Sequence, residues 1–158
     1  MPTVAPLDLA GHCVSANFVA GIPFFSLAEG EIHRLDHGQK SAAAHDGLLA
    51  ATVTVDAKNL ITSGEDGRVC AISAQGNVTE LASVGRKWVN CVAAGPQGAV
   101  AFGWGTNATV RFADGKTKDL PHKRSVEAVA FAPKGMRIAV AHYGGASLHF
   151  PAADGKPT

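Results

Sequence analysis

The stretch that decides the fold runs from Val126 to Lys156 and reads VEAVAFAPKGMRIAVAHYGGASLHFPAADGK. It contains a short apolar run, a Pro-Lys-Gly turn, a second apolar run, a Tyr-Gly-Gly turn and a third run. Short apolar runs separated by Gly and Pro predict β-strands joined by tight turns. No segment of the chain repeats apolar residues at helical spacing, so the sequence predicts an all-β protein.

The same order of strands and turns recurs earlier in the chain. It is repeated over Trp88–Leu120 and Leu48–Ala82, and a more degenerate copy begins at Cys13. The third strands end at Ile72, Phe112 and Phe150, which are 40 and 38 residues apart. This period, with short strands and turns of Gly, Pro, Asn and Asp, is typical of β-propeller blades, each a small sheet of four strands.

The repeats predict one partial propeller over residues 1–158. We expect a leading outer strand over residues 4–10, blade 1 over 13–45, blade 2 over 48–83, blade 3 over 88–121 and blade 4 over 126–158. Blade 4 is expected to lack its outer strand, because the chain stops soon after its third strand. The fold class is therefore a β-propeller with about four blades of four strands.

The residues of blades 2 and 4 resemble the WD-repeat family. Leu60-Ile-Thr-Ser-Gly-Glu-Asp-Gly-Arg-Val is similar to that family's second strand, turn and third-strand start, and Val126-Glu-Ala-Val-Ala-Phe-Ala-Pro-Lys-Gly to its first strand and following turn. The resemblance covers nearly the whole chain, more weakly before Leu48, and is closest to stand-alone bacterial members. The closing Trp-Asp pair is absent, with Ile72-Ser73, Phe112-Ala113 and Phe150-Pro151 in its places.

The resemblance implies a structural hydrogen-bond network in blade 2. In the family, the Asp of the turn accepts hydrogen bonds from a His that precedes the first strand. Asp66 matches that Asp, His45 the His and Ser63 the strand hydroxyl. These three groups could be mistaken for a catalytic triad, but the resemblance assigns them a structural role within the sheet.

Four blades make only about half of a seven- or eight-bladed ring. We expect the chain to be the first half of a longer protein. Two alternatives stay open: two copies could exchange leading strands to form an eight-bladed ring, or one chain could close on itself as four blades. Closure matters because exposed sheet edges invite aggregation.

Composition excludes several classes of protein. The formal net charge of +1 and the 17% of charged residues give no general case for binding nucleic acid. Cys13, Cys70 and Cys91 are widely spaced and predict neither a disulfide framework nor a zinc site. The N-terminus lacks the features of a signal peptide, and no run of about 18 apolar residues predicts a membrane span. We expect a cytoplasmic protein without a cofactor.

No recognisable catalytic motif is present, so we expect a non-catalytic scaffold that binds another protein. Gly-x-Ser-x-Gly and the phosphate-binding loop are both missing. The alternative is a propeller with a metal-binding or enzymatic site in its central channel. His33 and His37, with Asp36 beside them, are the nearest candidates for a metal site, although a solvated turn explains them more simply.

Partners of the family usually dock on the face made by the turns between second and third strands and by the entries to first strands. Exposed Trp, Tyr and Arg dominate interface energies, and Lys and Arg beside Trp suit an acidic or phosphorylated segment. We expect Trp88 to pack between blades rather than face a partner, and for Trp104 both readings stay open. The residues on this predicted face are Arg86, Lys87, Trp88, Trp104, Asn107, His122, Lys123, Arg124 and Tyr143.

Overall fold

In a computed structural model of the chain, residues 6–151 are described, and strands alternate with tight turns throughout. Four antiparallel sheets follow one another along the sequence, each with its strands in chain order. Sheet 1 contains β1 (Cys13–Val19), β2 (Ile22–Leu27), β3 (Glu31–Leu35) and β4 (Gln39–Ala43). Sheet 2 contains β5 (Leu48–Val53), β6 (Asn59–Gly64), β7 (Arg68–Ser73) and β8 (Val78–Ser83).

The second half of the chain repeats this plan. Sheet 3 contains β9 (Val89–Ala94), β10 (Val100–Trp104), β11 (Asn107–Arg111) and β12 (Thr117–Pro121), with a short 3-10 turn over Pro96–Gly98. Sheet 4 contains β13 (Val126–Phe131), β14 (Ile138–His142) and β15 (Gly145–His149), and has three strands among the described residues. The all-β prediction is therefore confirmed.

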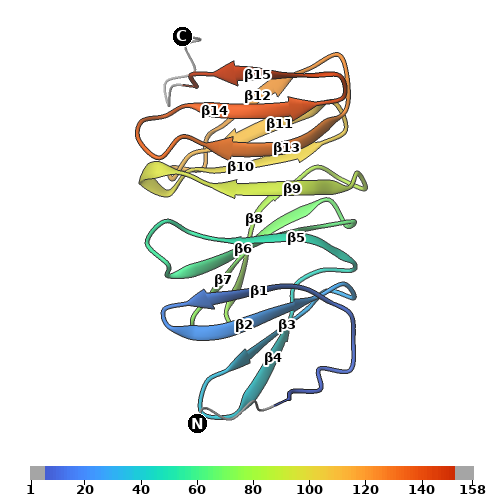
Figure 1. Cartoon of the computed structure of the whole chain (residues 1–158), viewed down its shortest axis with the longest axis vertical. Helices are drawn as coiled ribbons and strands as arrows, with labels where there is room; N and C mark the ends of the chain where they lie inside the picture. Colours follow the sequence, from blue (N-terminus) through green and yellow to red (C-terminus); the bar gives the residue numbers. More distant parts are fainter. Residues whose placement is uncertain (1–5, 152–158) are drawn as a thin grey trace.

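The four sheets are stacked face to face along the long axis of the molecule (Figure 1). The first strands β1, β5, β9 and β13 lie beside one another along this stack, because each contacts the first strand of the next sheet. Sheet 1 lies at one end and sheet 4 at the other (Figure 1). Radial stacking of small sheets along their first strands is the arrangement of β-propeller blades.

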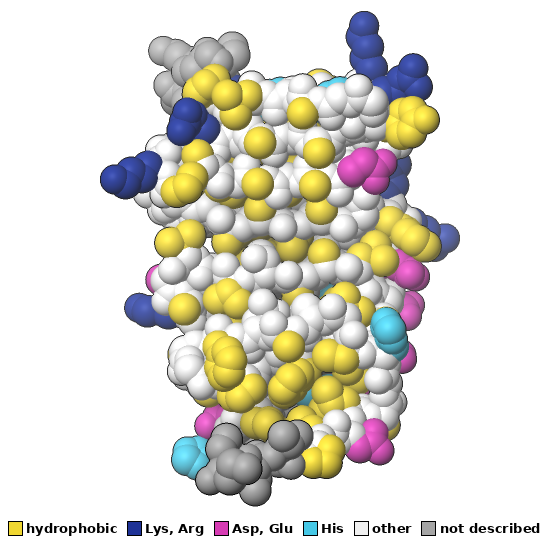
Figure 2. Space-filling model, viewed as in Figure 1, with side chains coloured by type: hydrophobic (Ala, Val, Ile, Leu, Met, Phe, Trp, Pro, Cys, Tyr) yellow, Lys and Arg dark blue, Asp and Glu magenta, His cyan; other side chains and the backbone are white. Residues whose placement is uncertain are grey.

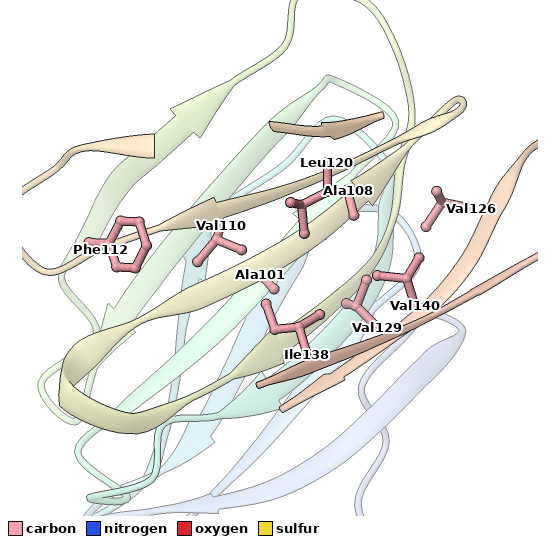
Figure 3. Close-up of a cluster of buried hydrophobic side chains, with 9 residues drawn as sticks. All are labelled: Ala101, Ala108, Val110, Phe112, Leu120, Val126, Val129, Ile138 and Val140. Carbon is pink, nitrogen blue, oxygen red and sulfur yellow. The ribbon is translucent and has the colours of Figure 1, made fainter. Parts of the chain in front are cut away.

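The core consists of the apolar layers between the sheets. Side chains alternate between the two faces of a strand, so each sheet supplies one set of residues to each neighbour. Phe24 and Ile32 of sheet 1 pack against Leu60 and Ile72 of sheet 2. Figure 3 shows the layer between sheets 3 and 4, where Ala101, Ala108 and Val110 of β10 and β11 face the valine and isoleucine side chains of β13 and β14.

The predicted leading strand over residues 4–10 is wrong for its described part. Residues 6–10 form no strand, and residues 4 and 5 lie outside the described range. The Ala10 amide donates to the Asp8 carboxylate over 2.9 Å, and Ala10 has a φ of 55°. This local turn competes with strand pairing. The prediction that blade 4 lacks its outer strand falls on residues 152–158, which also lie outside the described range.

Candidate functional site

The residues of the predicted binding face lie along one edge of the stack, which we call the entry edge. It is formed by the segments that precede first strands and by the turns that follow second strands. The segment 84–88 leads into β9 and the segment 122–125 into β13, while Tyr143 and Gly144 follow β14. Backbone hydrogen bonds join these parts, since Tyr143 N–H donates to Ser125 O over 2.9 Å and His122 N–H to Thr106 O over 2.9 Å.

The two tryptophans of this edge have opposite environments. Trp88 is 59% exposed, so the expectation that it packs between blades is wrong. Its neighbour Val89 is fully buried and starts β9, which directs the Trp88 side chain out of the sheet. Trp104 instead packs against the apolar layer between sheets 2 and 3, and its indole N–H donates to Thr109 Oγ1 over 3.0 Å. Trp88 is therefore the tryptophan available to a partner.

Cationic side chains cover two aromatic rings of the entry edge. Lys87 Nζ lies 5.1 Å from the centre of the Trp104 ring, and Arg124 Cζ lies 6.0 Å from the centre of the Tyr143 ring. Tyr143 is 68% exposed. Cation–π contacts of this kind orient long side chains without neutralising their charge. The remaining predicted residues vary: Arg86 and Lys123 are exposed, whereas Asn107 and His122 are half-buried.

The charges of the entry edge are separated along the stack. Arg86, Lys87, Lys123 and Arg124 belong to the segments of sheets 3 and 4. The corresponding segments of sheets 1 and 2 instead carry acidic residues, namely Glu29, Asp46, Glu65 and Asp66. In Figure 2 the dark blue side chains of the right-hand edge accordingly lie in its upper half, and magenta side chains predominate below. We call the upper part, formed by Arg86, Lys87, Trp88, Lys123, Arg124 and Tyr143, the basic aromatic surface.

The network predicted in blade 2 is present with one change. His45 Nδ1–H donates to Asp66 Oδ1 over 3.0 Å, as expected from the resemblance. The other ring nitrogen, Nε2, is hydrogen-bonded to the hydroxyl of Thr62 over 2.7 Å. The prediction had assigned this place to Ser63. Ser63 Oγ is buried without a hydrogen-bond partner. Neighbouring strand residues point to opposite faces, so only Thr62 faces His45.

The electrostatics of Asp66 fit this structural role. Burial acts to raise the pKa of the Asp66 carboxyl, but hydrogen bonds from His45 and from the amides of Asp46 and Arg68 outweigh it and lower that pKa. Since a carboxylate only accepts, His45 carries its proton on Nδ1 and accepts from the Thr62 hydroxyl on Nε2. Both ring nitrogens are thus occupied, and the His45 side chain is wholly buried.

Sequence reasoning missed a second polar cluster, between sheets 3 and 4. His122 Nδ1–H donates to Leu120 O over 2.8 Å, and its Nε2 accepts from Ser147 Oγ over 2.7 Å. His149 Nε2 lies 2.8 Å from the same Ser147 Oγ and 3.2 Å from His122 Nε2. His122 precedes β13 as His45 precedes β5, so it corresponds to His45 and not to a residue of an open binding face.

The candidate metal residues of sheet 1 are not brought together. His33 is buried, with its Nε2 3.0 Å from Glu31 and its Nδ1 3.2 Å from Gln39 Nε2. The His37 side chain is 97% exposed. Within residues 6–151, no three His, Cys, Asp or Glu side chains are grouped so as to hold a metal ion. Over the same residues, no helix has the length and apolar character needed to span a bilayer.

A cleft lies at the opposite edge of the stack, between sheets 2 and 3. It has a volume of about 460 Å³ and is lined by Val55, Asp56, Leu81, Gln97 and Arg111, among others. The Arg111 guanidinium donates from Nε to the Leu81 carbonyl over 3.0 Å, so this N–H is already used within the protein. The Thr54 hydroxyl, also in the lining, donates to Asp56 Oδ1 over 2.7 Å, and the same oxygen accepts from the Lys58 amide over 3.1 Å, so this carboxylate takes part in the turn between β5 and β6.

Stacked antiparallel sheets with adjoining first strands define this chain as a set of β-propeller blades. Solved structures agree. The β-propeller domain of Cps50 (Swd1) from Myceliophteria thermophila matches with a TM-score of 0.73 and 12% identity, over 86% of this chain and 50% of that one. The computationally designed Ika4 protein matches with a TM-score of 0.77 and 17% identity, over 95% of this chain and 99% of that one.

A third match is the dihydro-heme d1 dehydrogenase NirN in complex with DHE, with a TM-score of 0.69 and 14% identity over 93% of this chain and 36% of that one. The chain therefore spans half or less of the length of two of these neighbours. Neither protein-family models nor curated proteins match the sequence. At these identities the likeness establishes the fold, and function has to come from the site.

Proposed function

We propose that this protein is a non-catalytic scaffold of WD-repeat type, which binds an acidic segment of another protein on its basic aromatic surface. The hydrogen bond between His45 and Asp66 supports membership of that family, since it is the bond that the resemblance implies. The propeller fold alone does not decide function, because one of its structural neighbours is a dehydrogenase.

The observation that carries the proposal is the exposure of two large aromatic side chains among unneutralised cations. Trp88 and Tyr143 are 59% and 68% exposed. Single exposed apolar residues are common, but Trp and Tyr beside Arg and Lys are the residue types enriched at protein interfaces. Within residues 6–151, the ion pairs involve none of the four cations Arg86, Lys87, Lys123 and Arg124.

The surface favours a peptide over nucleic acid. Stacking platforms for single strands present several aromatic side chains along a continuous basic groove. Here the acidic residues Glu29, Asp46 and Glu65 continue the same edge and would repel a phosphate backbone. A short acidic segment can instead be held within the upper half alone.

A random-peptide display library selected on the full chain tests the proposal. We expect enriched peptides to contain Asp or Glu beside an apolar residue. Their affinity, measured by calorimetry, should fall at least about tenfold in the variant K87A/W88A/R124A, because hot-spot side chains each contribute about 1–2 kcal/mol or more. The variant V55A/K58A, altered at the opposite edge, is the matched control and should bind normally. Recovery of no peptide, or of peptides that bind the first variant unchanged, would contradict the proposal.

A further inference from the structure

The exposed face of sheet 4 consists mostly of small apolar side chains. In the strand register, Ala128 lies opposite Ala141 and Ala141 opposite Ala146, while Ala130 lies opposite Ala139 and Ala139 opposite Leu148. Directly paired residues share a face, so these six side chains form one surface, which we call the C-terminal end face. All six are exposed, Leu148 by 57%. The alternate residues Val129, Ile138 and Val140 are buried against sheet 3.

Sheet 1 has an exposed apolar face at the other end of the stack. Ala16 pairs with Phe25 and Phe18 with Pro23, and these four residues define the N-terminal end face. Phe18 is 68% exposed. Phe24, which points the other way, is 1% exposed and packs against sheet 2. Each end of the stack thus has one apolar face that no neighbouring sheet of the same chain covers.

We propose that two copies of this chain associate head to tail, with the C-terminal end face of each packed on the N-terminal end face of the other, in a closed ring of eight blades. Eight blades lie within the range known for propellers. The inference goes beyond the proposed function, because it concerns the end faces and not the entry edge.

The two end faces match each other in the way that sheets 3 and 4 already do. In that contact the small residues Ala101 and Ala108 receive Ile138 and Val140. By strand register, Ala139 has in sheet 4 the place of Ala101 in sheet 3. Phe25 has in sheet 1 the place of Val140 in sheet 4. The C-terminal end face, made mostly of alanines, therefore meets the N-terminal end face, which contains two phenylalanines. Side chains of different size can interdigitate there without overpacking.

Phe18 corresponds to a residue that already makes this kind of contact. Phe18 pairs with the first part of β2 as Phe131 pairs with the start of β14. The Phe131 ring lies so close to Gly95 that a Cβ built there would be 2.6 Å from it. In sheet 4 the place of Gly95 is taken by Ala132, because both residues follow a first strand and donate across the next turn. Because Ala132 carries a Cβ, we expect Phe18 of one copy to lie beside Ala132 of the other, farther from its backbone than the Phe131 ring is from Gly95.

The backbone offers a matching hydrogen bond. Leu48 N–H donates to Ala28 O over 2.8 Å, and Val126 N–H donates to Gly105 O over 2.9 Å. Both bonds join neighbouring sheets in the same way. The donor is the amide of the residue that begins a first strand, and the acceptor is the carbonyl of the residue directly after the second strand of the preceding sheet. Cys13 and Tyr143 hold these two places at the ends of the chain. Head-to-tail association would direct Cys13 N–H to Tyr143 O of the second copy.

Area favours a closed pair over a single contact. Strands about 4.8 Å apart with a rise of about 3.3 Å per residue give flat areas of roughly 350 Å² for the four-stranded end and 240 Å² for the three-stranded end. Because the smaller face limits each contact, one contact buries roughly 500 Å² in total, which is typical of crystal packing, whereas the two contacts of a closed pair bury about 1,000 Å², the threshold for a biological interface. Because both complementary faces belong to this chain, a second copy is the occupant that makes both contacts at once.

Size-exclusion chromatography with light scattering over a concentration series tests the proposal. We expect the full chain to elute with twice the mass of its 16.2 kDa chain. In a pair of identical copies, each of the variants Ala139→Lys and Ala16→Glu places one unpaired charge in both contacts, so each variant should be monomeric. Mixed together, they should form a heterodimer, since one contact gains an opposite-charge pair and the other is unaltered.

Controls separate loss of association from loss of fold. Ala16 and Ala139 are exposed, so circular dichroism should be unchanged in both variants. Val55→Lys, exposed at the opposite edge, should remain dimeric. A wild-type chain that is monomeric throughout the series would overturn the proposal. So would a dimer that survives both charge variants, or folded variants that fail to associate on mixing.

Discussion

The His45 imidazole joins two parts of the chain through Asp66, with 3.0 Å between Nδ1 and Oδ1. Asp66 also accepts from the amides of Asp46 and Arg68, over 3.0 and 3.1 Å. One carboxylate therefore holds both the segment that precedes β5 and the turn that follows β6. Since these two segments set how the first and second strands of sheet 2 align, the network stabilises the sheet at its entry edge.

The choice of Thr62 over Ser63 can be tested with two matched substitutions. Thr62→Val leaves the buried His45 Nε2 without a donor, and should lower the free energy of unfolding by about 1–3 kcal/mol. Ser63→Ala removes a buried hydroxyl that has no partner, and should be close to neutral. Chemical denaturation of both variants provides the measurement. Equal losses for the two would contradict the assignment.

The Asp66 carboxylate should contribute to stability above acidic pH. Its pKa in the folded state is lower than the ordinary 3.8, so the unfolded state binds more protons in the interval between the two values. The free energy of unfolding should therefore fall as the pH drops below 3.8 and toward the folded pKa. In Asp66→Asn this part of the acid dependence should be missing. Denaturation midpoints measured across that range, with exposed Asp114→Asn as control, would show it.

His149 should make stability depend on pH in a higher range. Burial, followed by the nearby His122 and Lys118, lowers the pKa of His149 below the ordinary 6.5. Below pH 6.5 the unfolded state then binds more protons, so stability should decrease as the pH falls toward the folded pKa. We expect His149→Gln to flatten this slope in thermal unfolding curves. The matched control is His37→Gln, which removes a histidine that is 97% exposed; a similar flattening there would count against His149 as the cause.

Gly67 should tolerate no side chain. It has a φ of +76°, and a Cβ there would overlap the Gly85 carbonyl oxygen. Gly67→Ala should cost more than about 2 kcal/mol, because left-handed strain of about 1 kcal/mol or more adds to a backbone clash. Gly144 has a similar φ of +85° with open space around its Cβ, so Gly144→Ala isolates the strain alone. The free energy of unfolding measured by urea denaturation should be much lower for the Gly67 variant than for the Gly144 variant. The reverse order would refute the clash.

Two of the three cysteines should be protected from alkylation. Burial raises the pKa of both Cys70 and Cys91 to about 11, and the thiolate is the reactive form. Cys13 is exposed. In native protein at neutral pH, iodoacetamide should modify Cys13 alone, whereas in denaturant all three should react. Mass spectrometry of the labelled peptides gives the result, and rapid native labelling of Cys70 would show that sheet 2 opens readily.

The sequence by itself determined the elements that depend on neighbours along the chain. Alternating apolar residues and turns such as Glu65-Asp66-Gly67 are local signals, so the strands and their order could be predicted, and the bond between His45 and Asp66 followed from a family resemblance. The predicted ends of blades 2 and 3, at residues 83 and 121, coincide with the ends of β8 and β12.

Only the tertiary structure decided which side of each strand meets which neighbour. A shift of one residue reverses the face of a strand, and β6 has adjacent apolar residues, Leu60 and Ile61, followed by two adjacent hydroxyl residues, so its sequence allows either choice and Ser63 was predicted where Thr62 lies. Trp88 could be placed only once Val89 was seen to fill the layer between sheets 2 and 3. The two end faces likewise depend on how the strands of sheets 1 and 4 pair, because that register decides which side chains lie on the face that no neighbouring sheet of the same chain covers.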